Sequence, residues 1–154
     1  MLWNKILLVY DGSESALRAT EYIAKMFGKT EGLQVTIFGL HERVPRHDFK
    51  DTSPVVDKLA RHLTAMEREI ERGQARIKEA KALLAKAGPP ESSISIKYSE
   101  MKKSAVKDIL AEAKNGGYGT IVVGRSEAGG FILAGGNVAK DLAAQAKGFG
   151  VIVV

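Results

Sequence analysis

The sequence predicts a single α/β domain, 1–154, with a doubly wound open parallel sheet of five strands and helices on both faces. Short apolar runs alternate with longer segments of helical periodicity, which is the pattern of repeated βαβ units. The runs at 5–10 and 120–123 are apolar enough to be covered on both faces. Right-handed crossovers favour a doubly wound sheet. The strand order 3-2-1-4-5 is expected because it places these two runs side by side in the middle. A chain of 154 residues fits one domain with its own core.

The first part of the chain supplies two strands and a helix. Residues 5–10 form the first strand, and Ser13 then caps a helix. Residues 34–40 form the second strand, and 42–53 is a loop without periodicity. The apolar stripe that we expect to place the helix on the sheet is Ala16, Leu17, Ile23, Ala24 and Phe27.

Residues 54–87 are the longest periodic segment, with Pro54 in the first turn of a helix and Gly-Pro-Pro at 88–90 ending it. This pattern fits an amphipathic helix laid across the sheet or a coiled-coil seam. The first is favoured because Gly73 and Ala80 weaken a seam. Its apolar residues, spaced by three and four, are Val56, Leu59, Leu63, Met66, Ile70, Gly73, Ile77, Ala80, Leu84 and Ala87.

The second part supplies three strands and two helices. Residues 93–98 alternate apolar and polar side chains, as a half-exposed edge strand does. Residues 104–115 predict a helix and 120–123 a buried strand. A glycine-rich loop at 124–136 leads to a last helix at 137–146, and 151–154 closes the chain as the fifth strand.

Composition narrows the function. The chain has no cysteine, which excludes a disulfide framework, a thiolate zinc site and a cysteine nucleophile. The net charge of +5 mildly favours anionic ligands, but its basic residues are interspersed with acidic ones, so we expect no nucleic-acid partner. No apolar run approaches the roughly 20 residues of a membrane helix, so we expect a cytoplasmic protein without membrane contact.

Sequence signals for catalysis are weak. His41, His47 and His62 lack the spacing of metal ligands. The chain has no Gly-x-Ser-x-Gly elbow, no Walker A sequence and no Gly-x-Gly-x-x-Gly fingerprint after the first strand. We therefore expect no metal site and no catalytic residues.

A ligand crevice is expected where the carboxyl ends of the first and fourth strands meet. The loop after the fourth strand is rich in glycine, which lets the backbone approach a phosphate, and Gly135-Gly136-Asn137 begins a helix. Arg125 and Lys140 could add positive charge. The loop after the first strand supplies Asp11, which can accept hydrogen bonds from ribose or adenine. The structural alternative is that Asn137 and Asp11 only cap the helices that follow them.

The chain resembles the universal stress protein family over essentially its whole length. The resemblance rests on KILLVYDGSESALRATEYIAKMF at 5–27, on the long helix that ends at GPP, and on TIVVGRS at 120–126 before a glycine-rich turn. It implies an adenine nucleotide alpha hydrolase-like fold and an adenine-nucleotide site, with Mg only alongside ATP. By position, Asp11 would meet the adenosine and Leu40 would line the adenine pocket. The residues around the ribose and phosphates would be Val123, Gly124, Gly136, Asn137 and Val138.

The family's nucleotide pattern is Gly-x2-Gly-x9-Gly-(Ser/Thr), and this sequence departs from it. Glu127 stands where the second glycine is expected, in a loop one residue shorter, and Gly129 or Gly130 could replace that glycine. Asn137 replaces the hydroxyl residue. ATP, AMP, another adenylated ligand and no ligand are all left open. The candidate binding residues are Val9, Asp11, Ser13, Leu40, Val123, Gly124, Arg125, Ser126, Gly130, Gly136, Asn137 and Val138.

The last strand, VIVV, carries no charge or proline that would block pairing at its edge. The resemblance implies antiparallel pairing with its twin across a two-fold axis, so we expect a homodimer through Val151–Val154. We predict a dimeric stress-response module that binds or senses ATP or AMP, with at most slow hydrolysis because no general base is positioned. The alternative is a protein-interaction module of the same fold that binds no nucleotide and uses the 42–53 loop or the long helix. An enzyme of the related hydrolase type is less favoured, because its Ser-Gly-Gly-x-Asp-Ser loop is missing.

Overall fold

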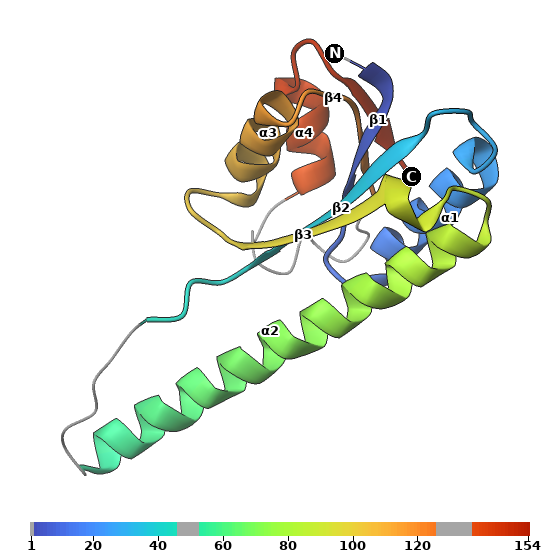
Figure 1. Cartoon of the computed structure of the whole chain (residues 1–154). Helices are drawn as coiled ribbons and strands as arrows, with labels where there is room; N and C mark the ends of the chain where they lie inside the picture. Colours follow the sequence, from blue (N-terminus) through green and yellow to red (C-terminus); the bar gives the residue numbers. More distant parts are fainter. Residues whose placement is uncertain (1, 46–52, 126–136) are drawn as a thin grey trace.

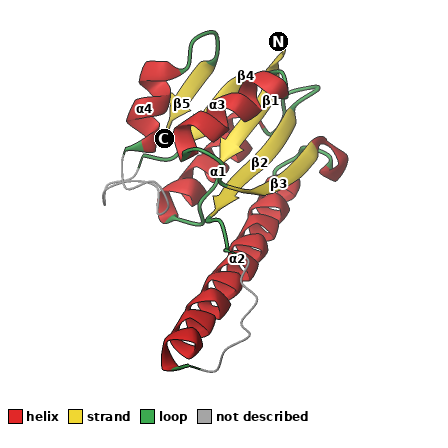
Figure 2. Ribbon diagram, turned by 90° about the vertical axis from the view of Figure 1, so that its left-hand side faces the viewer, coloured by secondary structure: helices red, strands yellow, loops and turns green. Residues whose placement is uncertain are grey.

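The computed structural model describes residues 2–45, 53–125 and 137–154, which build one five-stranded sheet with helices on both faces (Figures 1 and 2). All strand pairs are parallel and the order is β3-β2-β1-β4-β5, so the predicted fold class and strand order are confirmed. The elements are β1 (Leu2–Val9), α1 (Glu14–Phe27), β2 (Gln34–His41), α2 (Pro54–Lys86), a short 3-10 turn (Glu91–Ser93), β3 (Ile94–Glu100), α3 (Ala105–Asn115), β4 (Tyr118–Val123), α4 (Val138–Gln145) and β5 (Gly150–Val153).

Two apolar cores lie on the two faces of the sheet. Side chains alternate between the faces along a strand, so a central strand that is buried on both sides must be apolar throughout. In β1, Ile6 and Leu8 join the core beneath α1 and α2, whereas Leu7 and Val9 join the core beneath α3 and α4. All four side chains are at most 2% exposed. This explains why residues 5–10 show an apolar run rather than an alternating pattern.

The strand boundaries differ from the predicted ones at several ends. β1 begins at Leu2 instead of residue 5, because Leu2 pairs with Tyr118 of β4 beyond a shift of register. The side chains of Leu2 and Trp3 are 56% and 65% exposed, so only backbone pairing marks them as strand. β3 likewise continues to Glu100, where it still pairs with His41 of β2.

One expected core position of α1 is wrong. Leu17 was assigned to the apolar stripe, but its side chain is 39% exposed. The buried face of α1 instead includes Ala19 and Thr20, which lie closer to the line through Ala16 and Ile23. The Thr20 hydroxyl donates to the carbonyl of Ala16 at 2.8 Å, so its burial leaves no polar atom unpaired.

The long helix α2 has two different halves. Ile77, Ala80 and Leu84, all in its C-terminal half, belong to the core on the α1 side. The N-terminal half extends well beyond the sheet (Figures 1 and 2). The amphipathic-helix interpretation is therefore confirmed where α2 covers the sheet. No helix among the described residues has both the length and the apolar composition that crossing a membrane requires.

Candidate functional site

The loop after β1 is held by its own hydrogen bonds. Oδ1 of Asp11 accepts the backbone N–H of Ser13 at 2.9 Å. The Ser13 hydroxyl oxygen accepts the N–H of Ala16 at 3.2 Å, which confirms Ser13 as the N-cap of α1. Gly12 adopts a φ of +77°, which glycine tolerates far better than other residues. These contacts fix the Asp11 carboxylate at the carboxyl end of β1.

The end of β4 packs closely against this loop. A side chain at Gly124 would overlap the backbone carbonyl of Ser15. The end of β4 therefore needs glycine at this position to lie so close to the loop, whether or not a ligand binds there. The N–H of Arg125 donates to the carbonyl of Val154 at 2.7 Å, which extends the pairing of β4 with the end of the chain. Oδ1 of Asn137 accepts the N–H of Lys140 at 3.0 Å, so Asn137 is the N-cap of α4.

A narrow slot lies between these elements, where the crevice was predicted. Its volume of about 20 Å³ is close to the space of a single water molecule. Asp11 lies on its wall between the ends of β1 and β4. The described residues that line it are Val9, Asp11, Ser15, Ala16, Val123, Gly124, Asn137, Val138 and Ala139.

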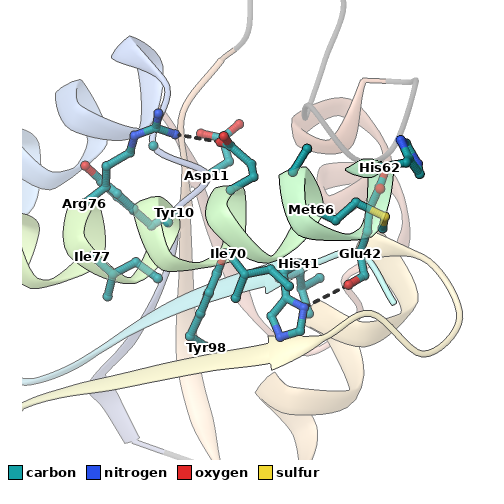
Figure 3. Close-up of a pocket in the computed structure, with 15 residues that line it drawn as sticks. Tyr10, Asp11, His41, Glu42, His62, Met66, Ile70, Arg76, Ile77 and Tyr98 are labelled. Carbon is teal, nitrogen blue, oxygen red and sulfur yellow. Dashed lines mark hydrogen bonds and ion pairs between the residues drawn. The ribbon is translucent and has the colours of Figure 1, made fainter. Parts of the chain in front are cut away.

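A larger cavity of about 340 Å³ lies between α2 and the carboxyl ends of β1, β2 and β3 (Figure 3). This volume is at the lower end of the range for small-ligand sites, roughly 300–1,000 Å³. Asp11 also lies on the wall of this cavity, so one residue borders both spaces. The principal lining residues are Tyr10 just after β1, Leu40, His41 and Tyr98 from β2 and β3, and Met66, Ile70, Gly73, Arg76 and Ile77 from α2.

Polar groups gather at the two ends of this cavity. Arg76 and Asp11 lie at one end, and His41, Glu42 and His62 lie at the other, with Ile70 between them (Figure 3). Nη1 of Arg76 forms an ion pair with Oε1 of Glu69 at 3.3 Å. Nδ1 of His41 lies 2.9 Å from the carbonyl oxygen of Glu42. The cavity therefore offers apolar surface in the middle and hydrogen-bonding groups at its rim.

Two tyrosines face this cavity in their neutral form. Burial raises the pKa of Tyr10, and the charges of Glu79 and Asp11 raise it further, while Arg76 opposes them. Burial also raises the pKa of Tyr98, aided by Glu69 and again opposed by Arg76. Both phenols therefore stay protonated at neutral pH and can donate a hydrogen bond.

Most of the predicted site residues lie on one of the two walls. Val9, Asp11, Val123, Gly124, Asn137 and Val138 are brought together at the slot. Leu40 lies on the wall of the larger cavity. Ser13 and Arg125 line neither space among the described residues, since Ser13 serves as a cap and the Arg125 side chain is exposed. Ser126, Gly130 and Gly136, together with Glu127, lie outside the described residues.

The sequence patterns did not predict that α2 forms one wall of the larger cavity. Met66, Ile70 and Gly73 follow the same spacing as the core residues of α2, so periodicity alone could not tell a cavity from a core. Tyr10 and His41 could have been found, because each stands at the carboxyl end of a parallel strand, where ligand sites gather.

The histidines do not form a metal site in the described part of the chain. His41 and His62 line the larger cavity, whereas His47 lies outside the described residues. Within 2–45, 53–125 and 137–154, no group of three histidine, aspartate or glutamate side chains could hold a metal ion.

The family model described as the universal stress protein family matches residues 3–154. This chain belongs to the universal stress protein family. The resemblance predicted from the sequence is therefore confirmed. No curated protein matches this universal stress protein significantly.

Solved structures share the fold of this chain. The universal stress protein UspA from Lactobacillus plantarum has a TM-score of 0.69 and 17% identity, covering 100% of this chain and 99% of that one. A universal stress protein from Archaeoglobus fulgidus in complex with dAMP has a TM-score of 0.56 and 18% identity, covering 99% and 98%. An Arabidopsis thaliana family member with AMP bound has a TM-score of 0.53 and 15% identity, covering 97% and 90%. At these identities the likeness shows the fold alone.

Proposed function

We propose that this universal stress protein binds an adenine nucleotide across the two spaces that Asp11 borders. The base occupies the larger cavity beneath α2, and the ribose and phosphate extend past Asp11 toward the slot between β4 and α4. The observation that carries this proposal is the position of Asp11 on both walls. The nucleotides in the Archaeoglobus and Arabidopsis relatives, dAMP and AMP, support a monophosphate as the ligand.

The charges around the larger cavity favour the base over the phosphate. Asp11, Glu42 and Glu69 place three carboxylates on its described wall, against the single arginine Arg76. A phosphate there would be repelled, whereas a neutral ring that carries an amino group would not. The apolar side chain of Leu40, which is 5% exposed, provides a surface for such a ring.

The slot suits the other end of the nucleotide. It opens at the N-terminus of α4, where the backbone N–H groups of the first turn and the helix dipole favour an anion. Val123 and Gly124 provide the backbone at the end of β4 against which a ribose would lie. Lys140 in the first turn of α4 adds an exposed positive charge.

Binding, rather than catalysis, is the activity that the described groups support. The Ser13 hydroxyl accepts the N–H of Ala16 and lies 3.0 Å from the hydroxyl of Ser15. Oδ1 of Asp11 is engaged with the N–H of Ser13. A nucleophile needs an adjacent base to activate it, and these hydrogen bonds instead hold the loop in place.

We also propose that two copies pair through β5. This strand lies at an edge of the sheet, next to β4 only, and its side chains are all apolar. An unpaired apolar edge favours association with another strand. A symmetric pair of these edges would form a closed dimer.

Calorimetric titration of nucleotide-stripped protein with AMP and ATP, with and without magnesium, tests the nucleotide proposal. We expect AMP to bind with a micromolar dissociation constant. Asp11→Ala should lower the affinity at least about tenfold, because it removes a group on both walls. Asp11→Asn keeps an oxygen for the Ser13 N–H, so a loss in this variant would come from the ligand contact and not from the loop.

Asp57→Ala is a matched control, because Asp57 is exposed in the first turn of α2 and lines neither space. The affinity of the Asp57→Ala variant for AMP should equal that of the wild type. An absence of heat and of a thermal shift at millimolar AMP and ATP would overturn the proposal.

A second candidate function is protein interaction through the N-terminal half of α2. Val55 is 76% exposed and Leu59 is 38% exposed on this projecting helix. Exposed apolar side chains on one side of a helix are typical of helix-in-groove recognition. Failure of nucleotide binding in the titration above would leave this candidate as the leading one.

A further inference from the structure

Arg76 lies on the cavity wall in an unusual position. It comes from α2, yet its side chain reaches across to the loop between β1 and α1. A Cβ atom at Gly12 would lie 2.7 Å from Cδ of Arg76 and 3.2 Å from its Nη1. The guanidinium is therefore stacked over a glycine that leaves it room, next to Asp11 and at the end of the cavity where Tyr10 lies (Figure 3).

Glu69 holds the guanidinium in this position. The two residues are separated by two helical turns, and Nη1 of Arg76 lies 3.3 Å from Oε1 of Glu69. Glu69 is also paired with Arg72, at 3.5 Å. The Arg76 side chain is 41% exposed, against 67% for Arg72, so only Arg76 is folded inward over the site. A half-exposed ion pair contributes little to stability, so stability alone does not explain this arrangement.

The electrostatic surroundings agree with this inward position. Arg76 opposes the rise in the pKa of both Tyr10 and Tyr98, so its charge reaches both sides of the cavity. One of its N–H groups is directed at Glu69, and arginine has further donors in the same plane. The planar guanidinium can stack on an aromatic ring while keeping its ion pair.

We propose that Arg76 is a ligand-contacting residue of the nucleotide site, which lays its guanidinium on the adenine base while Glu69 fixes its orientation. This inference rests on the proposed function, because it assumes that the base enters the cavity beneath α2. It adds a second layer to the site, in which α2 closes over a base that the strands support from below. The neighbouring carboxylates Asp11 and Glu69 favour a contact with the neutral base over one with the phosphate.

Calorimetric titrations of Arg76→Met and Arg72→Met with adenosine and with AMP test the inference. Arg72 is the matched control, because it shares the partner Glu69 but does not line the cavity. Arg76→Met should lower the affinities for adenosine and for AMP by the same factor, about tenfold, because both ligands carry the base. Arg72→Met should bind both ligands as the wild type does. Arg76→Gln, as a second substitution, should show a loss similar to that of Arg76→Met.

Three outcomes are decisive against the inference. If Arg76→Met and Arg76→Gln bind as the wild type while Asp11→Asn is impaired, Arg76 is no ligand contact and the proposed function stands. If the loss appears for AMP but not for adenosine, Arg76 contacts the phosphate and the assigned role is wrong. If the wild-type protein binds neither ligand, the proposed function fails together with the inference.

Discussion

The hydroxyl of Tyr98 lies against the backbone of Gly73, in the place that a side chain at residue 73 would occupy. Gly73 is in the middle of α2, where glycine is normally unfavourable. Its absence of a side chain lets the helix approach β3 closely enough for Tyr98 to form part of the cavity wall. The glycine that weakens α2 as a coiled-coil seam is therefore the residue that seats the helix on the sheet.

Replacing Gly73 by alanine should destabilise the protein. In an exposed helix interior the change would add about 1 kcal/mol of stability, but overlap in a packed contact costs about 1–3 kcal/mol. We expect a net loss of about 1 kcal/mol in the free energy of unfolding, measured by urea denaturation. The double variant Gly73→Ala/Tyr98→Phe should recover part of this loss, because it removes the oxygen that the new methyl group meets. A Gly73→Ala protein more stable than the wild type would contradict the packing described for Tyr98.

Asn137 should be important for stability through its cap. Its side chain accepts the N–H of Lys140 at 3.0 Å, and loss of such a cap typically costs about 1 kcal/mol. We expect Asn137→Ala to lower the free energy of unfolding by about this amount. Asn137→Ser, which restores a hydroxyl residue of the family pattern, should change stability by only a few tenths of a kcal/mol. Equal losses in the two variants, measured by thermal and urea unfolding, would mean that the cap contributes nothing.

The proposed dimer can be broken without breaking the sheet. The N–H of Val154 donates to Val123 of β4, so by alternation the N–H of Val153 points to the free edge of β5. Val153→Pro removes that N–H and should leave the pairing with β4 intact. Equilibrium sedimentation should give twice the chain mass of 16.6 kDa for the wild type and for Val153→Ala, and 16.6 kDa for Val153→Pro. A wild-type monomer at micromolar concentration would contradict pairing through β5.

The two tyrosines that line the larger cavity, Tyr10 and Tyr98, should lose their phenolic protons at a higher pH than ordinary tyrosines do. Because burial raises the pKa of Tyr10 and Tyr98 above the ordinary value of about 10, folding favours their protonated forms. Their contribution to stability is complete below about pH 10 and is lost as the pH rises through the folded-state pKa. In a pH titration followed by near-ultraviolet absorbance, part of the phenolate absorbance of the wild type should appear only at the highest pH. Tyr10→Phe and Tyr98→Phe should each reduce this late component. If both variants leave that late signal unchanged, the late-titrating groups are not these tyrosines.

The sequence was sufficient for the fold because burial and local hydrogen bonding are encoded locally. The apolar runs of β1 and β4 identify the central strands, and the caps Ser13 and Asn137 mark where α1 and α4 begin. Leu2 and Trp3 were missed as strand because their side chains are exposed and only ladder pairing defines them. Leu17 was misplaced because an apolar residue beside a helical stripe has the same signal as one within it.

Only part of the candidate site could be predicted from the sequence. Asp11, Leu40 and Gly124 follow from the rule that ligands gather at the carboxyl ends of parallel strands. Arg76 and Tyr98 do not, because their place depends on how closely α2 approaches β3. That distance is set by Gly73, whose effect appears only when both elements are in place.

The anchoring of α2 by its C-terminal half makes the helix a lever. Its core contacts, Ile77, Ala80 and Leu84, and its seat at Gly73 form the short arm, and the segment back to Pro54, in which Leu63 is buried, forms a long arm of about 28 Å. A tilt of about 5° at Gly73 would move the far end by about 2.5 Å, by the same geometry. Any ligand that widens the cavity beneath α2 by a fraction of an ångström would therefore produce a several-fold larger displacement at the tip of the helix.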